Sequence, residues 1–371
     1  MSQDRIFFPV HSIYVSNYTK GGSSIGQPIS APRGVQSCAI ETSFNLEQVF
    51  ELGQLDIYEN IEALPSVTVS TTKVLDGTKP IYFMATKGSV DDLNGKNALT
   101  QCDIWLNIYA QDQTASSGTP LQTVMCSGMY LNDITYNFPV DGNFTEELSF
   151  TGNDKFWNAK AVANGNTSAP SGNYSLYQPT GDFDNTDQAD VIGAGVQRRE
   201  DLRTEQCTFP TIIPGMAEVN AATTRVAAQL AFQEHVQSIS VSTSLGREDI
   251  YQLGARSPYY KSISFPLTVT CTFECISGEG DQVSADSLYN NLTNETIKLI
   301  VNEGLVLDLG DSNKLSRVSY NGGDATGGNV TTSYEFNNFN FLSIYTCDAN
   351  GSKDTLASHY PAITDDGSRP A

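Results

Sequence analysis

A segment near the start of the chain returns in its second half, and this duplication limits the possible folds more than any other feature. Residues 36–53 read QSCAIETSFNLEQVFELG, and residues 237–254 read QSISVSTSLGREDIYQLG. At a shift of 201 residues, seven of the 18 aligned positions are identical. Unrelated segments would share roughly one. A second pair, GNFTEELSF from Gly142 and GNVTTSYEF from Gly328, agrees at four of nine positions. The sequence therefore predicts two copies of one structural unit.

The two copies divide the chain into five parts. We expect an N-terminal arm at residues 1–34, a first domain at 35–156, a connector or insertion at 157–235, a second domain at 236–345 and a C-terminal arm at 346–371. Both domains have a size typical of independent compact units. The later part of the connector, from Ala217 to His235, is rich in alanine, and either a helix or an extended lead-in to the second copy fits it.

Within each copy, apolar and polar residues alternate as they do in half-buried strands. The segment LTVTCTFEC, from Leu267 to Cys275, places every apolar residue on one face and every threonine or glutamate on the other. Short helices are predicted at residues 284–292, which begin with a serine cap, and at the corresponding residues 90–99. The predicted fold class is therefore mainly β with a small α content, as two tandem β-barrel or β-sandwich domains, each with a short flanking helix.

The composition excludes several classes of protein. Acidic residues outnumber basic residues 42 to 21, giving a net charge of −21, so the surface repels nucleic acid. Seven irregularly spaced cysteines indicate reduced thiols rather than a disulfide framework. The start of the sequence lacks the basic and apolar regions of a secretory signal, and no apolar run approaches the length of a membrane span. We therefore expect neither secretion nor insertion into a membrane.

The residues that could carry chemistry do not converge in the sequence. The histidines fall in an arm, in the connector and in the tail: His11, His235 and His359. The C-x3-C pair, Cys271 and Cys275, lies on the apolar face of a predicted strand, which favours burial over metal binding. The acidic run at residues 182–190 lacks the glycine and the closing glutamate of a calcium loop. We expect no catalytic residue, no cofactor and no metal.

Four positions are kept in both copies and are predicted to be structural. They are Gln36 and Gln237, Glu47 and Glu248, Gly53 and Gly254, and Pro65 and Pro266. Each glycine ends an apolar and aromatic run, so it predicts a bulge, a sharp bend or a positive backbone angle. Each glutamate could be a lone catalytic acid, but without a partner acid an ion pair between strands or subunits is favoured.

These residues resemble the tail tube proteins of long-tailed bacteriophages. The resembling elements lie in the second copy, with weaker counterparts in the first: Val236-Gln237-Ser238, Arg247-Glu248, Leu253-Gly254, Pro258-Tyr259-Tyr260 and Phe265-Pro266. The resemblance implies rings of six β-barrel or β-sandwich domains around a channel, each domain flanked by a helix. With a duplicated domain, three chains would form a pseudo-sixfold ring.

The two copies differ at two places within the resembling region. The first copy has Asn45-Leu46 where the second has Gly246-Arg247, and Asp56-Ile57 where the second has Ser257-Pro258. The two domains therefore differ in surface chemistry at these places.

The resemblance implies a structural virion protein that forms the stacked rings of a tail tube, the conduit for DNA ejection. Its implied partners are its own copies in homotrimeric rings, a tape measure protein, a terminator, a distal tail or baseplate protein, and a sheath where the tail has one. DNA would pass through the lumen without specific binding. The protein would reside in the virion tail after assembly in the bacterial host cytoplasm. The alternatives are a distal tail or baseplate hub ring protein and a two-domain β-sandwich adhesin.

Overall fold

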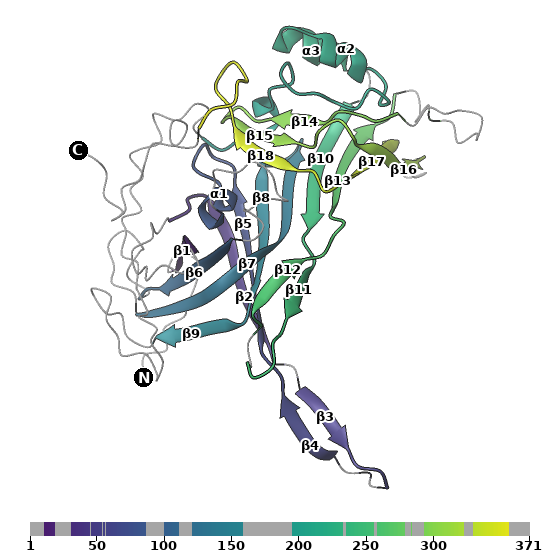
Figure 1. Cartoon of the computed structure of the whole chain (residues 1–371). Coiled ribbons are helices and arrows are strands. Elements are labelled where there is room, and N and C mark those ends of the chain that lie inside the picture. Colours follow the sequence, from purple (N-terminus) through teal and green to yellow (C-terminus); the bar gives the residue numbers. More distant parts are fainter. Residues whose placement is uncertain are drawn as a thin grey trace.

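The chain folds into antiparallel sheets with a few short helices, which confirms the mainly β fold class (Figure 1). The computed structural model describes residues 11–18, 31–44, 46–53, 55, 57–86, 100–110, 121–158, 195–232, 235–255, 258–278, 283, 293–322 and 329–355. The described strands of the first half are β1 His11–Tyr18, β2 Val35–Ser43, β3 Leu46–Phe50, β4 Ile57–Glu62, β5 Ser66–Val74, β6 Gln101–Ile108, β7 Gln122–Pro139, β8 Thr145–Gly152 and β9 Asp154–Asn158. Those of the second half are β10 His235–Ser244, β11 Arg247–Ile250, β12 Tyr260–Ile263, β13 Thr268–Ile276, β14 Lys298–Ile300, β15 Leu305–Asp308, β16 Lys314–Asn321, β17 Thr331–Phe339 and β18 Ser343–Thr346. The described helices are α1 Ile81–Ala85, η4 Arg199–Asp201, α2 Met216–Ala221 and α3 Arg225–Ala231.

The main sheet joins the two halves of the chain. Its strands follow the order β16-β17-β13-β10-β7-β8-β5-β2, and every neighbouring pair is antiparallel. The first four strands of this path come from the second half and the last four from the first half. Reading from β10 through β13 and β17 to β16 gives the same connectivity as reading from β2 through β5 and β8 to β7. The described strands contain no closed barrel; eleven of them form one continuous sheet in which the two halves are consecutive.

Further strands complete each half. In the first half, β6 and β9 pair with the N-terminal part of β7, and β1 pairs with β6. In the second half, β14, β15 and β18 form a separate sheet in which β15 is central, as the N-terminal part of β7 is central between β6 and β9. Strand β7 pairs with β6 and β9 along its N-terminal part and with β8 and β10 along its C-terminal part, and Gly128, with a φ of +64°, lies near this change of partners. Strand β1 lies within the expected N-terminal arm and buries Ile13, Tyr14 and Val15.

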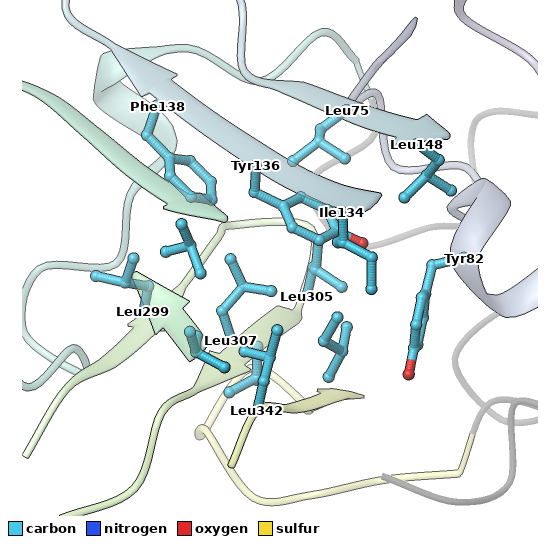
Figure 2. Packing of buried hydrophobic residues seen from close by; sticks show 14 of the residues in the cluster. Leu75, Tyr82, Ile134, Tyr136, Phe138, Leu148, Leu299, Leu305, Leu307 and Leu342 are labelled. Atoms are coloured by element: carbon cyan, nitrogen blue, oxygen red, sulfur yellow. The ribbon is translucent and has the colours of Figure 1, made fainter. Parts of the chain in front are cut away.

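One hydrophobic core spans both halves. The inward residues of β13, from Leu267 to Cys275, are buried as predicted, and they belong to the same cluster as residues of the first half. In Figure 2, Ile134, Tyr136 and Phe138 on β7 face Leu305 and Leu307 of the small sheet of the second half. The two halves therefore stabilise each other by burying apolar surface in common.

The described part of the connector ties the halves together. The backbone of Gln197 bonds to Leu75 and Phe144 in the first half, and Arg203 and Thr208 bond to Ile300 and Lys298 in the second. The alanine-rich part forms α2 and α3, so the helical alternative is correct until β10 begins at His235. Thr224 caps α3 by accepting a hydrogen bond from the Ala227 amide (3.3 Å). The helices predicted at residues 90–99 and 284–292 lie outside the described residues. Helix α1, which flanks the sheet of the first half, was not predicted.

Candidate assembly surfaces

The two halves meet where β7 pairs with β10, and we call this contact the internal junction. The pairing runs from Ser238 opposite Pro139 to Ser244 opposite Asp133. Beyond its two ends, the Val140 amide donates to Gln237 and the Leu245 amide donates to Asn132, both at 2.7 Å. Strand β7 of the first half and β10 of the second half pair with each other, so the backbone groups of these two edges are hydrogen-bonded along the junction.

The strands equivalent to β10 and β7 lie at the two ends of the main sheet. Strand β2 corresponds to β10 through the repeat, and β16 corresponds to β7 through a shared irregularity. The β7–β8 register shifts between Leu131 and Asp133, and the β16–β17 register shifts between Leu315 and Arg317. Among the described strands, β2 and β16 each pair on one side only. In the described part of the chain, both sides of a junction like the internal one are therefore present and unoccupied at the ends of the sheet.

Two aromatic residues at these free edges are exposed, although their counterparts at the internal junction are buried. Leu245 is 0% exposed, whereas its counterpart Phe44 beside β2 is 74% exposed. Tyr136 is 0% exposed, whereas its counterpart Tyr320 on β16 is 53% exposed. Corresponding large side chains are thus buried at the internal junction and exposed at the free edges. Such exposed apolar side chains mark a candidate interaction surface.

Each half also carries a β-hairpin with exposed apolar side chains. The hairpin β3–β4 extends far from the sheets in Figure 1, whereas β11–β12 lies closer to them. The exposed large side chains of the first hairpin and its flanks are Phe44, Leu46, Phe50, Leu52, Leu55, Tyr58 and Ile61. Those of the second are Ile250, Tyr251, Leu253, Tyr259 and Phe265. Apolar surface on this scale marks both hairpins as candidate interaction surfaces.

Arg247 attaches the hairpin β11–β12 to the first half. Its Nε and Nη2 atoms donate to the Leu131 carbonyl at 2.9 and 2.5 Å, and its guanidinium lies 5.1 Å from the centre of the Tyr130 ring. Burial lowers the pKa of Arg247 to about 10. Within the hairpin, Lys261 pairs with Asp249 at 2.5 Å. The first hairpin has Leu46 at the position of Arg247, so it lacks this attachment within the chain.

The repeated glutamines and glycines have matching backbone roles. Gln36 and Gln237 each occupy the extra position of a bulge, at the register shifts of β2–β5 and β10–β13. The Nε2 atom of each donates to the carbonyl two residues before it, at 3.2 and 3.1 Å. Gly53 and Gly254 lie at the hairpin turns with φ of +94° and +85°, a region that favours glycine.

The other repeated positions show no shared chemistry. Glu47 and Glu248 are exposed on β3 and β11, and within the described part of the chain neither forms an ion pair. Pro65 and Pro266 lie just before β5 and β13, where they end the connections from the hairpins.

A buried charged cluster lies between the two halves, formed by Lys73, Asp76 and Glu146 with Glu303 of the β14–β15 loop. Lys73 Nζ pairs with Asp76 at 2.7 Å, and Glu303 accepts a hydrogen bond from the Gly77 amide at 2.5 Å. Glu146 accepts from the amide of Ile81 at 2.8 Å. Burial raises the pKa of Glu146 and raises the pKa of Glu303 to about 7, because a low-dielectric interior disfavours the charged carboxylate.

The outer face of the main sheet is polar. Its described positions are mostly serine, threonine and asparagine, and the opposite face packs into the core. The acidic residues on this polar face are Glu41, Asp133, Glu147, Glu274 and Glu335. Among the described positions of these eight strands that share the face, the lysine and arginine residues are Lys314 and Arg317, both on β16. The face therefore carries a negative charge.

The candidates for chemistry remain dispersed. His11 begins β1 and His235 begins β10, whereas His359 and the acidic run at residues 182–190 lie outside the described residues. Cys271 and Cys275 are buried in the core. No cluster of side chains suited to a metal ion occurs in the described ranges. In the same ranges, no helix has the length and apolar character that crossing a membrane requires.

Sequence reasoning did not identify Phe44, Tyr320, Arg247 or Glu303 as contact residues. A signal for Phe44 was present, since the repeat aligns it with Leu245 as a conservative exchange. The contact partners of Arg247 and Glu303 come from distant segments, and a single sequence does not reveal such pairs.

Comparisons with known proteins give no sequence family. No protein-family model matches the sequence, and no curated protein matches it. Among solved structures, a chain of the anti-feeding prophage baseplate has 8% identity and a TM-score of 0.31, covering 44% of this chain and 100% of its own length. A chain of the anti-feeding prophage cap, described as a tube-terminating cap, has 11% identity and a TM-score of 0.30, covering 43% and 94%. An Hcp protein has 13% identity and a TM-score of 0.23, covering 42% and 94%. Each of these chains is thus similar to less than half of this chain, at low identity.

Proposed function

We propose that this chain is a structural subunit that assembles with its own copies into rings, and that the rings stack into a tube of a bacteriophage tail. The observation that carries the proposal is the internal junction, because the counterparts of both its strands lie at opposite ends of the same sheet, each with one edge that no described strand pairs. Strand β16 of one chain would pair with β2 of the next, as β7 pairs with β10. The sheet would then continue from chain to chain.

The repeat predicts the register of this proposed contact between chains. Tyr136 lies opposite Val241 at the internal junction, and Ile134 lies opposite Thr243. Their counterparts place Tyr320 of one chain opposite Ile40 of the next, and Val318 opposite Thr42. In this register Tyr320 and Phe44 become buried, which removes apolar surface from water.

The contact is head-to-tail, so successive chains form a ring if the rotation closes and a helical filament if it does not. We propose a ring of three chains. Such a ring contains six copies of the repeat, in which domains 35–156 and 236–345 alternate. Because closure removes the free edges of β2 and β16, it also removes the tendency of those edges to aggregate.

The hairpins supply contacts outside the sheet. Their exposed apolar side chains would be covered by copies in the same or the adjacent ring, which would stack the rings into a tube. Other tail proteins, such as a tape measure protein, a terminator and a baseplate protein, would bind the ends and the lumen. The role is structural rather than enzymatic, and DNA would pass through the channel in the virion. A hub protein would differ in forming one terminal ring.

Electron microscopy of the purified protein tests this function. We expect stacked rings with threefold symmetry and two unequal densities per chain. Phe44→Asp and Tyr320→Asp should each prevent ring formation while the monomer stays folded, because both side chains are exposed in the single chain. Val226→Asp, at an exposed apolar residue of α3, is the matched control and should assemble normally.

Three outcomes would contradict the proposal. Rings of six whole chains would exclude the alternation of the two domains within a ring of three. Unchanged assembly of both edge variants would exclude the contact between β2 and β16. Single rings that never stack would favour the hub protein.

A further inference from the structure

The contact between chains has a different set of charges from the internal junction. At the root of the attached hairpin, Arg247 lies opposite Ile263 and contacts Tyr130 of β7. At the corresponding positions of the other copy, Leu46 stands for Arg247, Glu62 for Ile263 and Lys314 for Tyr130. Leu46 lies opposite Glu62 in the hairpin β3–β4, and Lys314 begins β16. A cation–aromatic contact is thus replaced by a lysine and a glutamate that belong to different chains.

A second pair of positions shows the same exchange. Ser244 lies opposite Asp133 at the internal junction, and Ser242 is the next residue on the same face of β10. Ser43 is the counterpart of Ser244, and Arg317 is the counterpart of Asp133. Glu41 is the counterpart of Ser242. In the shared register, Arg317 of one chain lies diagonal to Glu41 of the next. Diagonal neighbours across an antiparallel pair are about 7 to 8 Å apart, which long side chains can bridge.

These four charged side chains are available in the single chain. Glu41, Glu62, Lys314 and Arg317 are all exposed, and none forms an ion pair with another described residue. Arg317 lies opposite Glu335 on β17 within its own sheet, yet the two side chains are not within ion-pair distance. The edge strand β16 therefore presents two positive charges, whereas β2 and the hairpin β3–β4 that follows it present one negative charge each at the counterpart positions.

We infer that the edge of β16 is a recognition surface for a second copy of this chain, with Lys314 facing Glu62 and Arg317 facing Glu41 of that copy. This inference rests on the proposed function, since it uses the β16–β2 contact. Exposed ion pairs contribute little to affinity, whereas like charges placed together at an interface are strongly unfavourable. The charges therefore act on specificity: they reject the pairing of two β16 edges or two β2 edges.

Charge reversal tests the inference. Variant A carries Glu41→Lys and Glu62→Lys, and variant B carries Lys314→Glu and Arg317→Glu. We expect each variant alone to raise the protein concentration needed for half-assembly by roughly tenfold or more, because like charges then face each other. The chain carrying all four substitutions should assemble within about threefold of the native chain, since the pairs are restored with their signs exchanged. Analytical ultracentrifugation measures these concentrations.

Two controls separate the charges from general effects. Arg199→Glu and Glu218→Lys reverse exposed charges on η4 and α2, away from both edges of the sheet, and should leave assembly unchanged. Raising the salt concentration should weaken the defects of variants A and B, because salt screens exposed charges.

Mixing variants A and B distinguishes this inference from the proposed ring of three. In the mixture, A beside B restores both ion pairs, whereas A beside A or B beside B keeps like charges together. In a ring with an odd number of chains, variants A and B cannot alternate all the way round. The mixture should therefore assemble more poorly than the chain that carries all four substitutions. Full rescue by mixing would support the charge pairs and contradict the ring of three. Normal assembly of variants A and B alone would overturn the charge pairs but would not contradict the ring of three. Failure of the chain with all four substitutions to assemble would also overturn the charge pairs.

Discussion

The carboxyl group of Glu303 is buried between the two halves of the chain, and it faces Lys73, Asp76 and Glu146. Its pKa of about 7 lies above the ordinary value of 4.5, so the folded chain holds this proton more tightly than the unfolded chain does. The stability that the protonated carboxyl provides is complete below pH 4.5 and is lost as the pH rises toward 7. Burial raises the pKa of Glu146 as well.

Glu303→Gln should remove much of this pH dependence. The amide oxygen of glutamine can still accept the hydrogen bond from Gly77, and the side chain carries no charge. At pH 8 we expect the variant to be more stable than the native chain by roughly 1 to 3 kcal/mol, whereas at pH 5 the two should differ little. Urea unfolding from pH 5 to 8 measures this difference, with Glu218→Gln on the exposed face of α2 as the control. Parallel pH profiles for the native chain and the Glu303 variant would contradict the prediction.

At the scale of elements, the positive φ of Gly53 and Gly254 shapes the turns of the two hairpins. A Cβ atom at either position would meet no neighbour within 4 Å, so valine would cost backbone strain rather than a clash. We expect Gly254→Val to destabilise the chain by about 1 to 3 kcal/mol, because β11–β12 is attached to the body through Arg247. Gly53→Val should impair assembly more than stability, since β3–β4 extends from the body.

Asparagine tolerates positive φ better than valine, so Gly53→Asn and Gly254→Asn are the matched variants. They should lie between the native chain and the valine variants in urea unfolding and in tube formation. Full assembly and unchanged stability of both valine variants would refute a role for these turns in directing the hairpins.

The elements predicted from the sequence were those with a strong local signal. The alternation in LTVTCTFEC predicted β13 and its buried face correctly, because a strand with one face in the core has a period of two residues. The repeat predicted corresponding strands in the two halves. It did not reveal that β7 and β10 join both halves into one sheet, because strand neighbours distant in sequence leave no local pattern.

The assembly surfaces were predictable only in part. The differences between Asn45-Leu46 and Gly246-Arg247 indicated that the two copies differ in surface chemistry, but the contact of Arg247 with Leu131 and Tyr130 required the fold. Lys314 and Arg317 lie outside the segments that the repeat aligned, and their counterparts emerged only from the shared register shift. Positions without similar residues can be aligned through backbone irregularities, which structure shows and sequence does not.

At the scale of the whole molecule, the polar face of the main sheet is the candidate wall of a channel. Its opposite face is packed into the core, and we propose that in a closed ring the polar face lines the inside. Duplex DNA carries about one negative charge per 1.7 Å of its axis, and a basic wall would bind its phosphates and hinder passage. In such a channel, the acidic residues of this face would repel DNA instead, over a screening distance of about 8 Å at physiological salt. Such a wall keeps the duplex away from its surface without a long-range barrier.

Exchanging Glu147 and Glu274 together for lysine tests this role of the wall. Both side chains are exposed on the polar face and lie on β8 and β13, away from the edges of the sheet, so assembly should be unaffected. We expect the double lysine variant to slow DNA ejection from virions, and assembled tubes of the variant to retain DNA at low salt and release it at high salt. The double glutamine variant, which removes charge but can keep the hydrogen bonds with Asn137 and Ser238, should have a smaller effect. Ejection at the native rate from tubes that carry the lysine residues would show that the charge of this face does not govern the passage of DNA.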